Sequence, residues 1–208
     1  AWGYEQRLHR GWGAYGEDDF GSAVALARRA IAADRDDAHV MALAGFVLVM
    51  IARDYEQGLQ ATERALEINP NIAFVSMLVG WSQVYGGDPV KAVTCFENAI
   101  RVSPADPGAF FFYTGAATGH IFCGHPDKAY DLANKSARMY ADWDTTYWVL
   151  IPALVQLGRM EEARSAVSKF LELSPTSTVS QLRELMALRN PDYLKMTLDG
   201  MAVAGLPE

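Results

Sequence analysis

The chain has 208 residues, of which 50% are hydrophobic and 21% charged, and its formal net charge is −7. This composition is that of a globular chain with enough apolar mass for a continuous core. The 18 Lys and Arg residues are scattered without a run. Their scatter argues against nucleic acid or an anionic membrane as the main partner, because phosphate binding needs clustered basic side chains.

The cysteine count and the start of the chain bear on the compartment and on completeness. Cys95 and Cys123 are too few for a disulfide framework, which predicts a reducing, cytoplasmic compartment. The longest apolar stretch without a charge, Val40 to Ala52, is too short for a bilayer, which takes about 20 residues. The chain begins at Ala1 without an initiator Met, so we expect a piece of a longer protein.

A repeat runs through most of the chain. A small residue opens the second half of each unit, and successive small residues are 35, 34, 37 and 34 positions apart. Such a period, with apolar residues at helical spacing, predicts stacked helical hairpins. Five units are expected, at 4–36, 37–70, 71–104, 105–141 and 142–175, and their small residues are Ala23, Gly58, Ala92, Ala129 and Ala163.

Further small residues predict where the helices cross. In unit three, Ala99 follows Ala92 by seven positions, which keeps both on one stripe of a helix and lets a neighbouring helix approach closely. Pro104 then prevents the helix from continuing. Glycines in the first helices of units one to four serve the same close packing, and they are Gly11, Gly45, Gly80 and Gly115.

Other signals mark helix starts and departures from the repeat. Asp88-Pro89 and Asp106-Pro107 each predict an N-cap followed by proline at the first helical position. Unit four, at 37 residues, predicts a longer first helix or a longer turn. Unit five has Leu150-Ile151 where the others have a small residue.

Residues 176–208 leave the repeat and are expected to form two capping helices of the same domain. The stretch from Thr178 to Leu188 predicts one helix. A second should begin at Asn190-Pro191 and end at Gly205. Such a cap covers the apolar face that the last repeat otherwise exposes.

The repeat resembles the tetratricopeptide (TPR) family. This resemblance implies an all-α, right-handed α-α superhelix of about five helical hairpins, whose first helices line a concave groove. The tail stretches 188–193 and 200–208 are similar to those of TPR regions that follow a class III adenylate/guanylate cyclase domain or a winged-helix regulator domain in proteobacterial proteins. In unit three the TPR resemblance is carried by Val79-Gly80, Tyr85, Ala92, Phe96, Ala99 and Pro104.

Two short motifs raise the question of a cofactor or a metal. The stretch from Gly11 to Gly16 spells G-x-G-x-x-G, but a dinucleotide-binding loop must follow a strand, and this one ends a predicted helix. His120, Cys123 and His125 cluster near a turn, with Asp127 nearby, whereas a closed zinc site needs four ligands. We therefore expect no cofactor and no tightly bound metal.

The sequence also argues against catalysis. It contains no G-x-S-x-G, no P-loop and no H-E-x-x-H motif. No histidine has an obvious nucleophile beside it in the sequence. We therefore predict that the chain is not an enzyme.

The predicted groove is aromatic and Met-rich, which suits an apolar or amphipathic helix better than a charged tail. For any one of these side chains, packing between helices is the more frequent role. An open groove this long would exceed the few hundred Å² that monomers expose, so we expect a second copy, a partner segment or the chain's own tail to cover it. The predicted groove residues are Trp12, Tyr15, Phe46, Met50, Phe74, Met77, Trp81, Tyr85, Phe112, Tyr113, His120 and Trp148.

These features predict a non-catalytic protein–protein interaction scaffold, and a homodimer is a further option. The resemblance of the tail implies the C-terminal TPR region of a bacterial signalling protein, with a cyclase or winged-helix domain before Ala1. The alternative is a free-standing chaperone or assembly adaptor of the same fold, which binds an apolar or amphipathic segment.

Overall fold

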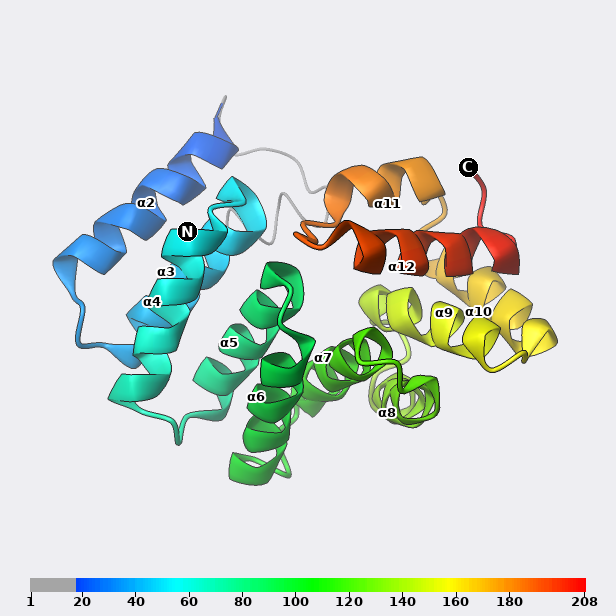
Figure 1. Ribbon diagram of the computed structural model, residues 1–208, viewed down its shortest axis with the longest axis horizontal. Helices are drawn as coiled ribbons and strands as arrows, with labels where there is room; N and C mark the ends of the chain where they lie inside the picture. Colours follow the sequence, from blue (N-terminus) through cyan, green and yellow to red (C-terminus); the bar gives the residue numbers. More distant parts are fainter. Residues whose placement is uncertain (1–17) are drawn as a thin grey trace.

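The computed structural model describes residues 18–208 of the chain. All regular structure in this range is helical, as predicted, and none of these helices is long and apolar enough to cross a membrane. In chain order, with the labels of Figure 1, they are α2 (Asp19–Ala33), α3 (Ala38–Val47), the π-helix η1 (Leu48–Ala52), α4 (Tyr55–Ile68), α5 (Ala73–Gly86), α6 (Pro89–Val102), α7 (Ala109–Phe122), α8 (Pro126–Met139), the 3-10 helix η2 (Asp144–Thr146), α9 (Tyr147–Gln156), α10 (Met160–Leu173), α11 (Val179–Leu185) and α12 (Pro191–Ala204).

Consecutive helices pair into hairpins that stack along the chain, as the order of colours in Figure 1 shows. The pairs are α3 with α4, α5 with α6, α7 with α8, and α9 with α10. α2 packs on α3, and the first half of the first predicted unit lies outside the described range. The result is a helical solenoid in which the first helices of the hairpins, α3, α5, α7 and α9, pack side by side.

Capping residues explain where two of these helices begin. The Asp88 carboxylate accepts a backbone N–H from the first turn of α6, and Pro89 is its first residue, as predicted. The same prediction for Asp106 and Pro107 is wrong, because α7 begins at Ala109. The Asp106 side chain instead accepts the N–H two residues further on, and this local bond forms a turn ahead of the helix.

The longer fourth unit arises from its connections. Helix α7 has 14 residues, as α5 does. The connection before α7, residues 103–108, is two residues longer than the connection before α5, residues 69–72. The turn after α7, residues 123–125, is one residue longer than 87–88. Of the two predicted explanations, a longer turn is therefore the correct one.

Glycines bring the α5–α6 and α7–α8 hairpins together around one aromatic ring. A Cβ added at Gly80 of α5 would lie 2.8 Å from the ring of Phe96, and one added at Gly115 of α7 would lie 2.1 Å from it. Phe96 belongs to α6 and is fully buried. Its ring therefore fills the space that the two missing side chains leave, which is the close crossing that the sequence predicted for these glycines.

The small-residue stripe of α6 leads to a first stability prediction. Ala92 and Ala99 are both fully buried. Ala99→Leu forces a branched side chain into close-packed space, so we expect the free energy of unfolding to fall by about 1–3 kcal/mol. Urea unfolding measures this change, with Val90→Leu as the control, because Val90 lies on the same helix and is 69% exposed. An unchanged midpoint in Ala99→Leu would show that the packing of this stripe is misassigned.

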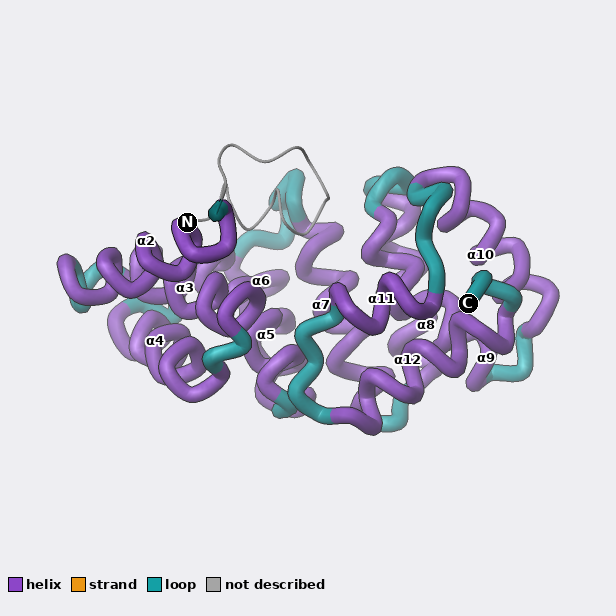
Figure 2. The backbone as a smooth tube through the Cα atoms, turned by 90° about the horizontal axis from the view of Figure 1, so that it is seen from above, coloured by secondary structure: helices purple, strands orange, loops and turns teal. Residues whose placement is uncertain are grey.

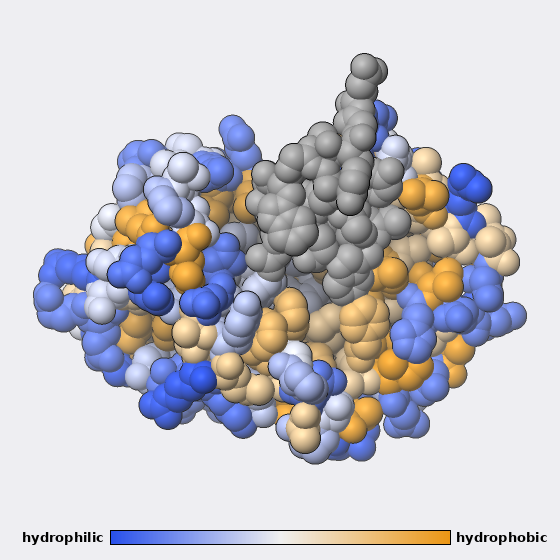
Figure 3. All heavy atoms as spheres, turned by 180° about the vertical axis from the view of Figure 1, so that it is seen from behind, coloured by the Kyte–Doolittle hydropathy of each residue, from blue (hydrophilic) through white to orange (hydrophobic). Residues whose placement is uncertain are grey.

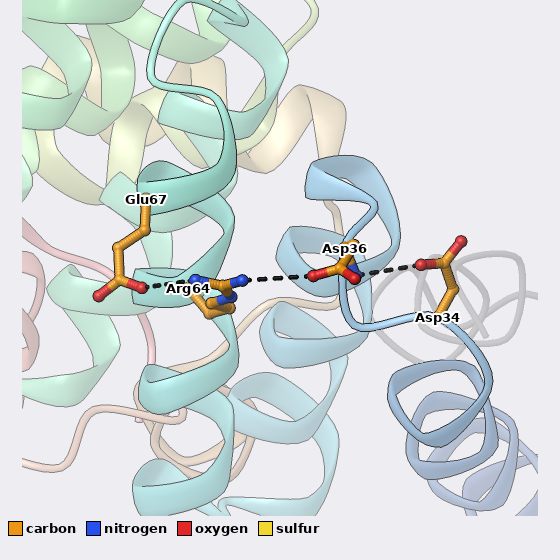
Figure 4. Close-up of polar contacts among 4 residues, drawn as sticks. All are labelled: Asp34, Asp36, Arg64 and Glu67. Atoms are coloured by element: carbon orange, nitrogen blue, oxygen red, sulfur yellow. Dashed lines mark hydrogen bonds and ion pairs between the residues drawn. The ribbon is translucent and has the colours of Figure 1, made fainter.

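A charged cluster joins the turn between α2 and α3 to α4 (Figure 4). Arg64 contacts Asp36 at 3.3 Å and Glu67 at 3.1 Å, and the N–H of Asp36 donates to Asp34. All four residues are exposed, so solvent screens these charges and the cluster contributes little to stability. On the face drawn in Figure 3, hydrophilic side chains likewise interrupt the visible hydrophobic patches.

The first tail helix is shorter than predicted. The sequence predicted a helix from Thr178 to Leu188, whereas α11 ends at Leu185. Met186 already has an extended backbone, with φ −69° and ψ 114°. The residues that would have extended the helix make their contacts with distant parts of the chain.

The second tail helix agrees with the prediction. Asn190 is its N-cap, and Gly205 takes the left-handed conformation at its end. α12 packs along α9 and also contacts α10, so it covers the last hairpin as a cap does. Gly200 permits this approach, because a Cβ there would lie 2.6 Å from the ring of Pro152 in α9.

Candidate functional site

The end of α11 and the segment that joins it to α12 return to the middle of the solenoid. We call residues 184–190 the latch. The backbone N–H of Arg189 donates to the carbonyl oxygen of Tyr85, in the last turn of α5, over 2.9 Å. In Figure 1 the start of α12 accordingly reaches the upper end of α5. The latch therefore joins the tail to helices that lie far from it in the sequence.

Two side chains of the α3–α4 hairpin bind the backbone of the latch. The Tyr55 hydroxyl donates to the carbonyl oxygen of Ala187 over 2.9 Å, and the Arg53 guanidinium donates to that of Glu184 over 2.8 Å. Burial raises the pKa of Tyr55, so its hydroxyl stays protonated at neutral pH and remains a donor. Both bonds end on carbonyl groups at or beyond the end of α11, where the helix leaves carbonyls without partners.

Arg53 reaches the latch from a strained backbone position. It directly follows the π-helix η1, and its φ of 52° is the one positive value of a non-glycine residue within 18–208. The left-handed region costs a residue with a Cβ about 1–2 kcal/mol. π-Helical turns are frequent at functional sites, where they re-aim a side chain. Here the strain and the bond to the latch occur at the same residue.

Side chains of the latch and of the first helices line a small, partly open cavity. Met186 and Leu188 line it from the latch, and Trp81, Tyr85 and Trp148 line it from α5 and α9. Its volume of about 30 Å³ leaves room for about one water molecule. The groove is therefore filled at this point by the chain's own tail.

Aromatic contacts extend this attachment on both sides of the cavity. Tyr193 of α12 stacks on Phe122 of α7, with ring centroids 4.4 Å apart and planes inclined by 4°. The guanidinium of Arg189 lies 5.5 Å from the ring centroid of Tyr55, within the range of a cation–π interaction. The tail thus contacts the α3–α4, α5–α6 and α7–α8 hairpins.

The predicted groove residues form no open surface among the residues that the structure describes. Trp12 and Tyr15 lie outside that range, as does the stretch from Gly11 to Gly16. Phe74, His120 and Trp148 are partly exposed. Partner binding by any of these residues stays a prediction. The remaining seven are at most 8% exposed, and they are Phe46, Met50, Met77, Trp81, Tyr85, Phe112 and Tyr113.

Two of the predicted groove residues, His120 and Tyr113, do not line this cavity. Thr118 and Ile121 line the cavity from α7, and His120 lies about 200° around the helix from Thr118, at 100° per residue. Partner binding by His120 stays a prediction, and burial lowers the pKa of this side chain. The ammonium group of Lys135 in α8 lies 4.1 Å from the ring centroid of Tyr113, so that ring faces the second helix of its own hairpin.

The candidate metal and nucleophile residues are not assembled into a site. Among residues 18–208, no group of three or more His, Cys, Asp and Glu side chains is placed to hold a metal ion. His120 and His125 are neighbours, with ring centroids 5.8 Å apart, and Cys123 is a free thiol. Burial raises the pKa of Cys95 to about 11, which keeps this thiol protonated and unreactive at neutral pH.

Sequence reasoning missed the latch and the residues that hold it. Neither Tyr55 nor Arg53 was singled out. Leu188 was expected at the end of a helix. The one signal near the latch was the 188–193 stretch, which drew attention as a resemblance of the tail. A repeat period carries no information about an extended segment that folds back across it.

Solved structures of other proteins share this fold. The type IV pilus biogenesis factor PilW matches with a TM-score of 0.68 at 14% identity, over 97% of this chain and 88% of that one. PilF of Pseudomonas aeruginosa matches with 0.64 at 17% identity, over 98% and 87%. YrrB, described as a TPR protein with an unusual peptide-binding site, matches with 0.54 at 17% identity, over 86% and 90%.

Sequence comparison adds one partial likeness. No family model matches the chain. A STIP1 homolog of Dictyostelium discoideum is 30% identical over 103 residues, which are 50% of this chain and 17% of that protein. The chain thus spans about a sixth of the length of this relative. Together with the stacked hairpins, these likenesses show that the fold is TPR-like.

Proposed function

We propose that this chain is a non-catalytic interaction scaffold that holds an apolar or amphipathic polypeptide segment against its first helices. One observation carries the proposal: the first helices, together with Arg53 and with Tyr55 at the start of α4, already hold a polypeptide segment, the latch, by apolar side chains and by hydrogen bonds to its backbone. The same donors, acceptors and apolar surface suit a segment of another protein. The likeness to YrrB, a TPR protein with a peptide-binding site, supports this proposal.

The setting that we propose is a cytoplasmic bacterial signalling protein, of which this chain forms the C-terminal region. The resemblance of the tail at 188–193 supports it. A second candidate, an assembly adaptor, is favoured by the likeness to the pilus biogenesis factor PilW. The gene sequence before Ala1 distinguishes them: an encoded cyclase or winged-helix domain supports signalling, and a start codon with no such domain contradicts it.

A titration with a designed amphipathic peptide tests the scaffold function. The probe is a labelled amphipathic peptide of about 18 residues, with leucines at alternate positions and Lys and Glu elsewhere, so that it has an apolar face when extended. We expect it to bind the whole chain at least about tenfold more tightly than a scrambled peptide of the same composition, because only the ordered peptide has an apolar face. Fluorescence anisotropy measures both affinities.

Two controls make this test decisive. An all-acidic peptide of equal length should bind weakly, because an apolar surface does not compensate the free energy that its carboxylates lose on leaving water. Both designed peptides are also titrated against Leu188→Ser, a variant that weakens the latch. The proposed function fails if neither protein distinguishes the ordered peptide from the scrambled one.

A further inference from the structure

The latch is buried at its centre, where Met186 and Ala187 are 5% and 1% exposed, and it is exposed toward its ends. Its residues Glu184 and Arg189 are exposed, and Leu185 and Leu188 are only partly buried. Segments with few buried contacts and solvent-exposed hydrogen bonds open locally at low free-energy cost. Opening of the latch therefore begins at its exposed ends, and it must also remove Met186 and Ala187 from the core.

The helices on either side of the latch have anchors of their own. Leu198 and Met201 of α12 are at most 1% exposed, in the helix that packs along α9. The N–H of Val179, at the start of α11, donates to the carbonyl oxygen of Pro207 over 2.8 Å. Figure 2 shows α11 and α12 as separate helices joined by a loop. The latch can thus separate from α5 while α11 and α12 keep their own contacts.

The latch covers the surface that we propose for a partner. Leu188 and Met186 line the same cavity as Trp81, Tyr85 and Trp148. Two segments cannot occupy this surface together. We propose that the latch is an internal pseudo-ligand, which closes the groove until a partner segment with the same chemistry displaces it. This inference rests on the proposed function and names its partner and its regulation.

The contacts of the latch define the partner's chemistry. In an extended chain, side chains two positions apart point to the same side, and Met186 and Leu188 both line the cavity. The next residue, Arg189, places its guanidinium over the ring of Tyr55. The Ala187 carbonyl between them accepts the Tyr55 hydroxyl. The partner is therefore an extended protein segment with two apolar side chains two positions apart, followed directly by a basic residue.

A closed latch weakens the apparent affinity for such a partner. A segment tethered in the same chain competes at high effective concentration. The apparent dissociation constant equals the intrinsic one divided by the fraction of open molecules, so opening the latch tightens binding. Replacing Leu188 by serine removes apolar area from the latch alone and leaves the surface beneath unchanged.

The test is a titration of the whole chain with a labelled peptide that has the sequence of residues 183–192. We expect Leu188→Ser to bind this peptide roughly tenfold more tightly than the unmodified chain does. Met186→Ser, a second latch variant, should give a similar gain. Arg183→Ser is the matched control, because Arg183 is exposed on α11 just before the latch. Its affinity should equal that of the unmodified chain.

Altered peptides test the chemistry on Leu188→Ser. A peptide with serine in place of the residues that correspond to Met186 and Leu188 should lose binding by more than about tenfold, because the cavity is then left unfilled. A peptide with glutamate in place of the residue that corresponds to Arg189 should bind severalfold more weakly, because the cation–π contact with Tyr55 is lost. Equal affinity of all three peptides would overturn the proposed recognition.

Amide hydrogen exchange provides a readout that does not depend on the peptide. The Arg189 amide, bonded to Tyr85, should exchange faster in Leu188→Ser than in Arg183→Ser, while amides within α5 stay protected. Circular dichroism shows whether each variant is folded. The tighter peptide binding must be measured in at least one latch variant, Leu188→Ser or Met186→Ser, that is folded.

Three outcomes would overturn the pseudo-ligand. Equal peptide affinity in folded latch variants and the unmodified chain would show that the latch does not compete. The scaffold function would survive that result if the amphipathic probe still binds. Failure of both probes would remove the function as well. Concentration-dependent dimers of Leu188→Ser that bind no peptide would assign the opened surface to a second copy.

Discussion

Gly115→Ala should lower the free energy of unfolding by about 1–3 kcal/mol in the unmodified chain, but raise it by about 1 kcal/mol when Phe96 is also replaced by alanine. The three atoms nearest to an added Cβ at Gly115 all belong to the ring of Phe96, the closest at 2.1 Å. With the ring present, the methyl group forces fully buried side chains apart. Once the ring is gone, the intrinsic preference of a helix for alanine over glycine remains.

A double-mutant cycle in urea measures this change of sign. Phe96→Ala alone should cost about 3–5 kcal/mol, because it leaves a cavity between α5 and α7. Gly119→Ala is the matched control, one turn further along α7, where the nearest atom to an added Cβ belongs to Val93 at 2.7 Å. Its effect should be the same with and without Phe96. An additive cycle for Gly115 would contradict the packing of this ring between the hairpins.

The repeat made this part of the fold predictable from the sequence. Gly80 and Gly115 stand in the first helices of units three and four, and Phe96 contacts Gly80 within its own unit and Gly115 in the next unit. Local chemistry was less certain: Asp88 and Asp106 each precede a proline, yet only Asp88 caps a helix. In the six-residue connection before α7, the Asp106 side chain closes a turn with its own backbone instead of capping the helix.

The candidate site was harder to predict because its contacts are not local. Residues up to Leu188 have helical spacing, and their intrinsic preferences favour a longer α11. The carbonyl groups that leave the helix instead bond to Arg53 and Tyr55, more than 130 positions earlier in the chain. Such tertiary bonds override helix propensity. The aromatic residues of the groove were recognised, but the sequence alone left three possible covers for them.

Trp81 shows how the structure changes a prediction made from the sequence. Taken as an open groove residue, its replacement by alanine would weaken partner binding by about 2 kcal/mol and leave stability intact. In the structure Trp81 is 8% exposed, its ring meets that of Phe96 edge to face at 5.5 Å, and it stacks near Tyr85 at 6.0 Å. It is a core residue on one side and part of the latch cavity on the other.

Trp81→Ala should therefore lower the free energy of unfolding by about 3–5 kcal/mol and also release the latch. Urea unfolding measures the first effect, and faster exchange of the Arg189 amide measures the second. Trp148→Ala is the comparison, because Trp148 lines the same cavity from α9 but is only partly buried, so its stability loss should be smaller. Trp81→Phe keeps an aromatic ring against Phe96 and should recover part of the stability. If Trp81→Ala keeps full stability and loses only peptide binding, the ring is a binding anchor and the packing described for it is wrong.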